Sequence, residues 1–543
     1  MPLRQSNIDK LATREFDVLV LGGGINGAVS AAALSGKGVR VALIDRGDFA
    51  GFTSQESSNL AWGGIKYMET FDFALVRKLC LSRNQLIRNY PSIVEEIRFF
   101  TSVPKGFRHS RMKLYAGTWL YWFFGNCFTR TPRLVSKEQI AQEEPILAVD
   151  NVEGAFEYSD AYLHDNDSRF VFGFIRQAMN NGCVAANYVE SRGAERTNSG
   201  TWVTSARNVV DGSSFLIRAR VLVNACGPFV DDHNRLTGIK TEHHHALSKG
   251  VHLIVDRLTP NKRVLTLFAS DGRMFFVIPM GARTCIGTTD TPVNTPYTHV
   301  TDEDRQFILD NVNAHLRLPQ PLAKTHIVAE RCGVRPLAVK GEATTGDFLQ
   351  LSRKHAVEID HGRLHISIFG GKHTDCLNVG NEISDAVFRL GIPVPYPKHK
   401  WYGEPPPSLR REFEHQARLM RLDDYTNPAS TEPLSKRYWR RYGMEAFDLL
   451  EYIREDPRQA EVLIKATEYT RCEVVHKARG EMIVRLEDFL RRRSKIALVV
   501  RRNDIRESPG LLEACRILFG DRAQAEIDAY FGEEARAKGV ASG

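Results

Sequence analysis

Residues 16–27 read FDVLVLGGGING, and this stretch decides the fold of the first part of the chain. Its apolar run, with Val18 and Val20, predicts a strand. The glycines predict a tight turn, and residues 28–34 have helical composition. A second apolar run at 39–44 closes a βαβ unit of about 30 residues, the size that a right-handed parallel crossover requires. The sequence therefore predicts a Rossmann-type domain.

The glycines match the G-x-G-x-x-G pattern of a dinucleotide-binding turn. Gly22 permits the tight turn, Gly24 lets the backbone approach a diphosphate, and Gly27 lets helix and strand pack closely. The first turn of the helix, with Ile25 and Asn26, supplies backbone donors for that diphosphate. The alternative is a glycine-rich turn with a purely structural role.

The residues after the second strand favour FAD over NAD as the dinucleotide. Asp45 ends that strand 21 residues after Gly24, where a carboxylate accepts hydrogen bonds from a ribose diol. A hydroxyl-rich loop follows and suits the diphosphate and ribityl oxygens, and a glycine pair then allows the backbone to lie close to a flat ring. The predicted cofactor contacts in this part are Asp45, Arg46, Thr53, Ser54, Ser57, Ser58, Gly63 and Gly64. A solvated Ser/Thr loop is the alternative.

The length and composition are those of a soluble protein with two or three domains. The chain has 543 residues, of which 43% are hydrophobic and 25% charged. Strand and turn signals continue to about residue 395, so we expect a mixed α/β region over 15–395. Proline-rich residues 393–407 form a linker, and residues 408–535 have helical periods with almost no strand signal. A helical C-terminal domain is therefore expected.

Charge and cysteine spacing exclude several classes of protein. The net charge of +8 is modest, and residues 401–543 carry 26 Lys and Arg against 25 Asp and Glu, so no basic tail indicates nucleic-acid binding. The nine cysteines lie far apart without metal-ligand spacing, which favours reduced thiols in the cytoplasm and no metal site. The polar N-terminus and the short apolar runs predict neither a signal peptide nor a membrane span.

Several motifs together give a specific resemblance. The motifs in the first part of the chain are DRGDF at 45–49, GGIKY at 63–67, FDF at 71–73 and NACGPFVD at 224–231, followed by the stretches 287–291, 333–337 and 369–372. The helical part adds the stretches 440–443, 473–475 and 486–493. Over about residues 15–500, the chain resembles the FAD-dependent glycerol-3-phosphate dehydrogenases.

The resemblance implies a fold and a reaction. The fold would be a glutathione-reductase-type FAD domain interleaved with a substrate-binding sheet domain, followed by a C-terminal helical domain. The reaction would oxidise sn-glycerol 3-phosphate to dihydroxyacetone phosphate, with hydride passing from C2 to flavin N5 and the electrons then passing to a membrane quinone. Ala225, Gly227, Gly371 and Thr374 would add contacts to a noncovalently bound FAD. The resemblance is also compatible with a homodimer.

The substrate implied by the resemblance is a phosphorylated polyol, and its anion needs cationic donors. The family's substrate-binding arginines and lysine correspond to Arg335, Arg353 and Lys372, and Tyr67 matches a substrate-contact tyrosine. Arginine provides a bidentate fork for phosphate. Each charge taken alone also fits an ordinary surface or structural role.

The sequence departs from the family pattern near the reactive centre. Where the family usually has Lys, His and Arg in the flavin loop, this chain has Asn59, Trp62 and Lys66, and residues 372–377 also differ. Lys66 keeps the charge but loses the fork, and an indole cannot accept a proton. We therefore expect the general base to be His373, with Lys372 and Lys66 also acting in catalysis. His252 or a water molecule is the alternative base.

These departures leave two other functions open. The protein could be an FAD oxidoreductase that acts on another anionic hydroxy acid or amino acid. It could also be a catalytically inactive flavin-binding subunit, although the retained cations argue against this.

A basic and aromatic stretch lies between Thr101 and Lys137. It holds seven Lys and Arg residues and no acid, and it encloses the run WLYWFF at 119–124. Basic residues that flank aromatic residues suit the surface of an anionic bilayer. The stretch is compatible with a buried helix of the substrate domain with solvated flanks, and the alternative is peripheral attachment of a cytoplasmic protein to the cytoplasmic face of a membrane.

Overall fold

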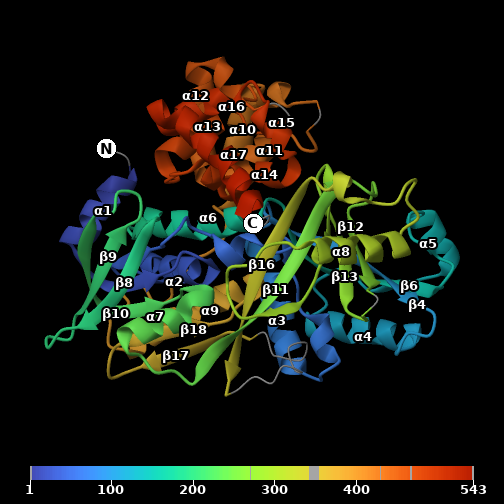
Figure 1. Cartoon of the computed structure of the whole chain (residues 1–543), viewed down its shortest axis with the longest axis horizontal. Helices are drawn as coiled ribbons and strands as arrows, with labels where there is room; N and C mark the ends of the chain where they lie inside the picture. Colours follow the sequence, from blue (N-terminus) through green and yellow to red (C-terminus); the bar gives the residue numbers. More distant parts are fainter. Residues whose placement is uncertain (1–2, 270, 342–353, 429, 465–466, 541–543) are drawn as a thin grey trace. The chain divides into compact units, whose positions relative to one another are not determined.

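The computed structural model describes residues 3–269, 271–341, 354–428, 430–464 and 467–540. These residues form two compact units, one of residues 11–402 and the other of residues 3–10 together with 403–540. The boundary between Tyr402 and Gly403 falls within the proline-rich stretch that the sequence predicts as a linker. Figure 1 shows the elements of both units.

The first unit contains the strands and most of the mixed α/β structure. Its strands are β1 (Glu15–Leu21), β2 (Val41–Ile44), β3 (Leu60–Ala61), β4 (Val94–Pro104), β5 (Arg133–Val135), β6 (Val152–Leu163), β7 (Val184–Ala186), β8 (Val189–Arg196), β9 (Trp202–Asn208), β10 (Ser214–Asn224), β11 (His243–Asp256), β12 (Arg263–Phe268), β13 (Met274–Met280), β14 (Arg283–Gly287), β15 (Thr291–Val293), β16 (Ala329–Lys340), β17 (Ala356–Asp360) and β18 (His365–Phe369). Its helices are α2 (Ile25–Gly36), α3 (Phe73–Asn89), α4 (Arg111–Phe124), α5 (Lys137–Glu143), α6 (Asp167–Asn180), α7 (Val230–Thr237), α8 (Asp302–His315) and α9 (Cys376–Arg389).

The first sheet carries the dinucleotide motif. Its strand order is β17-β18-β10-β1-β2-β7, and β9 and β8 extend it from β10 to eight strands within the described residues. β1 lies between β10 and β2 and is parallel to both. Residues 18–21 of β1 are fully buried, as expected for a central strand of a parallel sheet. Helix α2 begins at Ile25 rather than at residue 28, because extended Gly24 immediately precedes its first turn.

The second sheet is mostly antiparallel and packs over a core of its own. Its order is β15-β11-β14-β13-β12-β4-β6-β3, with β16 paired to β11 and β5 paired to β6. β11 pairs antiparallel with β16 over twelve residue pairs, from His243–Lys340 to Ile254–Ala329. Phe100, Leu253, Leu265, Phe275 and Ile308 belong to its buried core. The strand β11 is 14 residues long, so it supplies both pairing partners and part of this core.

The second unit is helical within its described residues. Besides most of α1 (Leu3–Thr13), it contains α10 (Pro407–Leu419), α11 (Leu434–Tyr442), α12 (Ala446–Glu455), α13 (Arg471–Gly480), α14 (Ile496–Val499), α15 (Arg502–Arg506), α16 (Leu511–Phe519) and α17 (Ala523–Val540), and a π-helical segment spans Asp488–Arg493. Two apolar clusters form its core, one around Phe413 and Trp439 and one around Phe489 and Leu511.

Candidate active site

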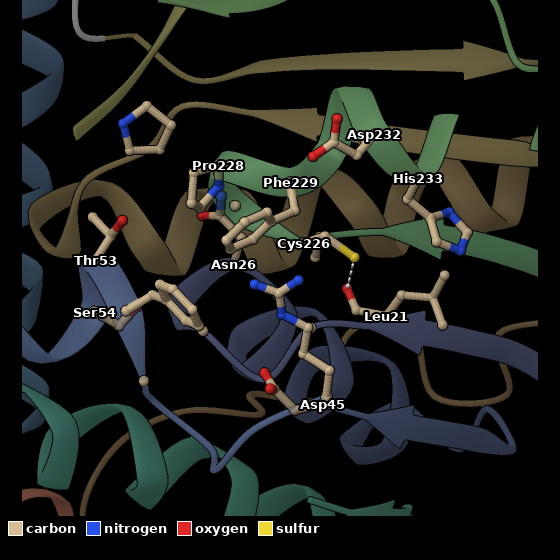
Figure 2. A pocket seen from close by; sticks show the side chains of 18 of the residues that line it. Leu21, Asn26, Asp45, Thr53, Ser54, Cys226, Pro228, Phe229, Asp232 and His233 are labelled. Atoms are coloured by element: carbon tan, nitrogen blue, oxygen red, sulfur yellow. Dashed lines mark hydrogen bonds between the residues drawn. The ribbon is translucent and has the colours of Figure 1, made fainter. Parts of the chain in front are cut away.

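A cavity of about 210 Å³ lies where the turn after β1 meets the ends of β2 and β10 (Figure 2). Its lining combines segments far apart in the sequence, which the parallel order β10-β1-β2 brings to one sheet edge. Eleven of the predicted cofactor residues line it: Gly22, Gly24, Ile25, Asn26, Asp45, Arg46, Thr53, Ser54, Ala225, Gly227 and Gly371. We call this space the nucleotide cavity.

The three glycines of the motif have different steric surroundings. A Cβ on Gly22, whose φ is +95°, would lie 2.5 Å from the Ala225 carbonyl oxygen. A Cβ on Gly27 would clash with the backbone of Gly22, so Gly27 serves the packing of α2 on β1. A Cβ on Gly24 would lie 3.2 Å from the Ser54 hydroxyl oxygen. Gly24 therefore borders space that a ligand can fill.

The N-terminus of α2 provides donors for a diphosphate. Gly24 precedes the helix and gives it no side-chain cap. Instead, the Ile25 N–H donates to the Ser54 hydroxyl oxygen over 3.0 Å. The Ser54 hydroxyl thus lies where a diphosphate oxygen would meet the helix dipole. Its own proton would then be oriented by the bound ligand.

Asp45 is positioned by the backbone for a ribose. Its Oδ2 accepts from the Gly23 N–H over 2.6 Å and its Oδ1 from the Gly47 N–H over 2.8 Å. Burial raises the pKa of Asp45, and the two backbone hydrogen bonds oppose that rise. Because a carboxylate has about four acceptor positions, Asp45 can still accept from a ribose diol.

An aromatic cluster surrounds Arg46 at the mouth of the nucleotide cavity. The guanidinium carbon lies 3.7 Å from the ring centroid of Phe229 and 5.2 Å from that of Phe52. Arg46 also donates to the Tyr297 hydroxyl over 2.8 Å. Sequence analysis predicted Arg46 but missed these three aromatic residues, because the contact between residues 46, 229 and 297 depends on the tertiary fold.

A buried polar atom without a partner marks the inner end of the nucleotide cavity. The Asn26 amide donates to the Gly370 carbonyl over 2.8 Å, which ties α2 to the loop after β18. Its Oδ1 is buried and has no hydrogen-bond partner within the described residues. A Cβ on Gly371, whose φ is +121°, would lie 2.8 Å from that oxygen. A ribityl hydroxyl could donate to Asn26 at this position.

These observations fit FAD. Gly24 and α2 leave room and donors for the diphosphate, Asp45 accepts from the ribose, and Asn26 offers an acceptor towards the loop that carries Gly371 and Lys372. Sequence analysis did not identify β8 as part of this site, yet Val189, Glu190 and Ser191 of β8 also line the nucleotide cavity. The strand signal after α6 could have revealed them.

The other predicted cofactor residues lie outside the lining of the nucleotide cavity. Ser57 accepts through its carbonyl from buried Arg331, and Thr374 donates to the Trp62 carbonyl over 3.1 Å. The Gly63 N–H donates to buried Asp160 over 3.0 Å, and a Cβ on Gly63 would clash with the Tyr121 hydroxyl. Packing against Tyr121 thus already requires this glycine. The remaining ones, Ser58 and Gly64, lie in the same loop; Gly64 has a φ of +77°.

Two of the predicted substrate residues contact each other. The Lys372 Nζ donates to the Tyr67 hydroxyl over 2.7 Å and lies 4.3 Å from the centroid of the Tyr67 ring. Lys66 precedes Tyr67 in a short helical turn, Ile65–Met68. The structure therefore brings Lys372, from the loop after β18, to the segment that holds Lys66 and Tyr67.

Arg335 lies on the second sheet beside a buried histidine. It donates to the Thr288 hydroxyl over 3.0 Å and lies 3.4 Å from the Asp290 carboxylate. Its guanidinium covers Gly250, where a Cβ would clash with it. His252 is two residues further along β11, so it projects from the same face of the sheet. Arg353, the other predicted arginine, lies outside the described residues.

Both candidate bases are held in the neutral form. Burial and then the charges of Arg335 and Arg331 lower the pKa of His252 to about 3, and its Nδ1 has no partner within the described residues. Burial also lowers the pKa of His373, whereas the Asp167 carboxylate raises it. The His373 Nε2 is likewise buried without a partner among the described residues. Each imidazole is therefore unprotonated at neutral pH, and its lowered pKa makes it a weaker base than an ordinary histidine.

A network of charges anchors the loop that carries Lys372 and His373. Asp375 lies 3.2 Å from His355 Nδ1 and 3.0 Å from Lys78 Nζ, and it accepts from Ser82 over 2.9 Å. Burial lowers the pKa of His355, but hydrogen bonds to Asp375 and Glu382 outweigh it and raise the pKa to about 8. The cationic imidazole thus ties β17 to the start of α9.

Comparisons with known proteins agree with this geometry. Residues 17–364 match the model of the family described as FAD dependent oxidoreductase, and residues 411–516 match the C-terminal domain of alpha-glycerophosphate oxidase. The chain is 29% identical to glycerol-3-phosphate dehydrogenase 2 of Mycobacterium tuberculosis, over 90% of this chain and 82% of that protein. It is 27% identical to an aerobic glycerol-3-phosphate dehydrogenase of Staphylococcus epidermidis, over 91% and 89%.

Among solved structures, the fold is similar to that of a glycerol-3-phosphate dehydrogenase from Bacillus halodurans complexed with FAD. The TM-score is 0.72 at 22% identity, and the match covers 98% of this chain and 97% of that one. The predicted α/β flavoprotein fold, the predicted resemblance and the predicted FAD cofactor are confirmed by these findings.

Proposed function

The chain belongs to the family of FAD dependent oxidoreductases, and from this membership we propose that it oxidises sn-glycerol 3-phosphate to dihydroxyacetone phosphate. Bound FAD supplies a hydride acceptor at N5. The observation that carries the proposal is the contact of Lys372 with Tyr67, together with buried, unprotonated His373, which follows Lys372 in the same loop. An anionic alcohol needs both cations for its phosphate and a neutral base for its hydroxyl proton.

Two similarly named relatives support the choice of substrate. Both curated relatives described above are named glycerol-3-phosphate dehydrogenases and match about nine-tenths of this chain. In our proposal Arg335, Arg353, Lys372, Lys66 and Tyr67 bind the phosphate and the polyol. Four of these five residues are basic, which suits a phosphate dianion.

Arg335→Ala tests this assignment. Removing one charge-assisted donor should cost about 1.5–3 kcal/mol, so KM for sn-glycerol 3-phosphate should rise about ten- to a hundredfold in an assay with a soluble dye as electron acceptor. The control is Arg283→Ala, which removes an arginine of β14 that pairs with Asp256 instead. Unchanged KM and kcat in Arg335→Ala, with activity present, would place the phosphate elsewhere.

Trp62 and Lys66 favour a second candidate within the same class of enzyme. Trp62 donates to the Tyr158 hydroxyl over 3.3 Å and offers no acceptor where the family usually has histidine. Another anionic hydroxy acid or an amino acid is therefore the second candidate substrate. The dye assay separates the candidates by rate, and a flavin-containing protein that reacts with no member of either class is the inactive binding subunit.

We further propose that the electrons pass to a membrane quinone and that α4 attaches the protein to the membrane surface. Met112, Trp119 and Phe123 of α4 are 58%, 40% and 64% exposed, and their spacing of seven and four residues places them on one helical face. Lys105, Arg111 and Lys113 belong to the same basic stretch and form no ion pair within the described residues, whereas Arg108, Arg130 and Arg133 have carboxylate partners. Within the described residues, no helix is both long and apolar enough to cross a bilayer.

Flotation with vesicles tests the attachment. We expect the protein to float with vesicles that contain an anionic lipid and to stay unbound with zwitterionic vesicles, because each cation near an anionic surface contributes about 1 kcal/mol. Trp119→Ser combined with Phe123→Ser should reduce the bound fraction at least fivefold. Phe388→Ser, which replaces an equally exposed phenylalanine on α9, should not. Equal binding of all three proteins would contradict the role of α4.

A further inference from the structure

A second cavity, of about 1030 Å³, adjoins the predicted substrate residues. Lys66 and Tyr67 belong to its lining, and Lys372 contacts it through Tyr67. From there it extends between α4, the strands β4 and β6, and residues 271–274. Figure 1 shows α4, β4 and β6 in the same part of the first unit. We call it the α4 cavity. Nothing assigned so far uses this space.

The size of the α4 cavity exceeds what the proposed substrate needs. Drug-sized ligands occupy cavities of about 300–1,000 Å³, whereas glycerol 3-phosphate has only about ten non-hydrogen atoms. The lining is largely apolar, with Met68, Phe71, Leu114, Leu120, Phe156 and Phe268 among its side chains. An extended apolar group would remove these side chains from water.

Charge in the lining indicates which kind of apolar ligand fits. The cationic side chains are those of Lys66, Arg108, Lys113 and Arg273, and the carboxylates are those of Glu69 and Asp271. Arg108 lies 2.7 Å from Glu69 and Arg273 lies 2.5 Å from Asp271, so both carboxylates are neutralised by arginines. The lining therefore has a net positive charge, which favours a ligand with an anionic head over a neutral apolar molecule.

A buried hydroxyl and an exposed rim complete the site. Thr101 belongs to the lining, and its buried Oγ1 has no hydrogen-bond partner within the described residues. At the rim, Phe71 is 76% and Leu120 40% exposed. Leu120 neighbours Trp119 on α4, so the mouth adjoins the exposed apolar side chains of that helix.

We propose that the α4 cavity binds the apolar chain of an amphiphilic phosphate, and that the substrates include glycerol 3-phosphate carrying an alkyl or acyl chain at its C1 oxygen. The second part rests on the proposed function. The reaction is unchanged: the C2 hydroxyl would lose its proton to the base, the C2–H bond would give its hydride to FAD, and the products would be the corresponding ketone and the two-electron-reduced cofactor. The phosphate lies among the predicted substrate cations, and the chain leads past Tyr67 towards the rim.

Gly117 of α4 offers a variant that fills the cavity without disturbing the fold. It lines the α4 cavity, and a Cβ added to it would meet no atom within 4 Å. Gly117→Trp therefore places an indole in the space of the chain, and Gly117→Ala is the control, since both variants raise helix propensity relative to glycine, alanine more than tryptophan. Both variants keep all predicted substrate residues.

The experiment uses the full FAD-containing protein below the critical micelle concentrations of its ligands. Anaerobic flavin reduction is measured with sn-glycerol 3-phosphate and its 1-O-alkyl ethers, and binding of dodecyl phosphate, which has no C2 hydroxyl, is measured by calorimetry. We expect the apparent dissociation constant to fall about fourfold for each buried methylene in the wild type and in Gly117→Ala. For Gly117→Trp, the apparent dissociation constant of the alkyl ethers should be at least tenfold higher than for the wild type. This variant should also bind dodecyl phosphate at least tenfold more weakly.

The outcomes separate this inference from the proposed function. Flavin reduction by glycerol 3-phosphate with no effect of chain length would overturn the inference and leave the proposed function standing. Binding of dodecyl phosphate that depends on Gly117, without reduction by any glycerol phosphate, would support the cavity's ligand class and overturn the proposed function. A neutral short-chain quinone that binds with dependence on Gly117, while dodecyl phosphate does not bind, would show that the cavity holds an acceptor and would overturn the inference.

Discussion

Gly24→Val should yield a folded protein that has lost its flavin. A Cβ at Gly24 would lie 3.2 Å from the Ser54 hydroxyl oxygen, a tight contact that a shift of this small side chain by a few tenths of an ångström relieves, and two further methyl groups would occupy the space of the diphosphate. We expect the ratio of flavin to protein after purification to fall at least tenfold. The visible flavin absorbance measures that ratio, and circular dichroism and gel filtration check the fold.

The choice of glycine makes this prediction specific. Substitution of Gly22 or Gly27 would force a side chain against the backbone of Ala225 or of Gly22, and loss of flavin would then report loss of fold. Gly24→Ala serves as the graded control and should retain more flavin than Gly24→Val. Full flavin content in Gly24→Val would show that the diphosphate does not approach this turn.

The second large effect concerns the proton of the substrate hydroxyl. We expect His373→Gln to slow anaerobic flavin reduction by glycerol 3-phosphate at least a hundredfold, because glutamine has a similar size but cannot accept the proton. In the wild type the rate should rise with pH as His373 loses its proton. Burial lowers the pKa of His373, so this inflection should lie below about 6.5, the ordinary value for histidine.

His252→Gln is the matched variant, because His252 is equally neutral and lies beside Arg335. If His373→Gln keeps the rate and the acid-side inflection while His252→Gln loses both, the base is on β11. Faster flavin reduction in Trp62→His would show that this chain lacks a base that the family usually has in the flavin loop. Stopped-flow measurements across pH with all three variants decide between these assignments.

The sequence could predict those parts of the site that depend on neighbouring residues. Gly22, Gly24 and Gly27 act through local backbone geometry, and Asp45 follows its strand directly, so spacing alone located them. The C-terminal helices were likewise apparent from periodicity. The family pattern added Ala225 and Gly371, which line the nucleotide cavity although they lie far along the chain.

Long-range packing limited the rest of the prediction. Gly63 was interpreted as a glycine beside a flat ring, but the Tyr121 hydroxyl of α4 also occupies the space of its Cβ. The α4 cavity could not be predicted, because its walls come from segments 65–73, 101–120 and 156–158 and from residues 268 and 271–274. Only the fold shows that the basic aromatic stretch borders the predicted substrate residues.

Anaerobic titration of the purified protein with sn-glycerol 3-phosphate tests the central proposal most directly. The proposal predicts loss of the oxidised flavin absorbance, formation of one dihydroxyacetone phosphate per flavin reduced, and no loss with glycerol, which lacks the anion that Arg335 and Lys372 would bind. A flavin that stays oxidised at saturating glycerol 3-phosphate, but is reduced by another anionic hydroxy acid or an amino acid, would contradict it.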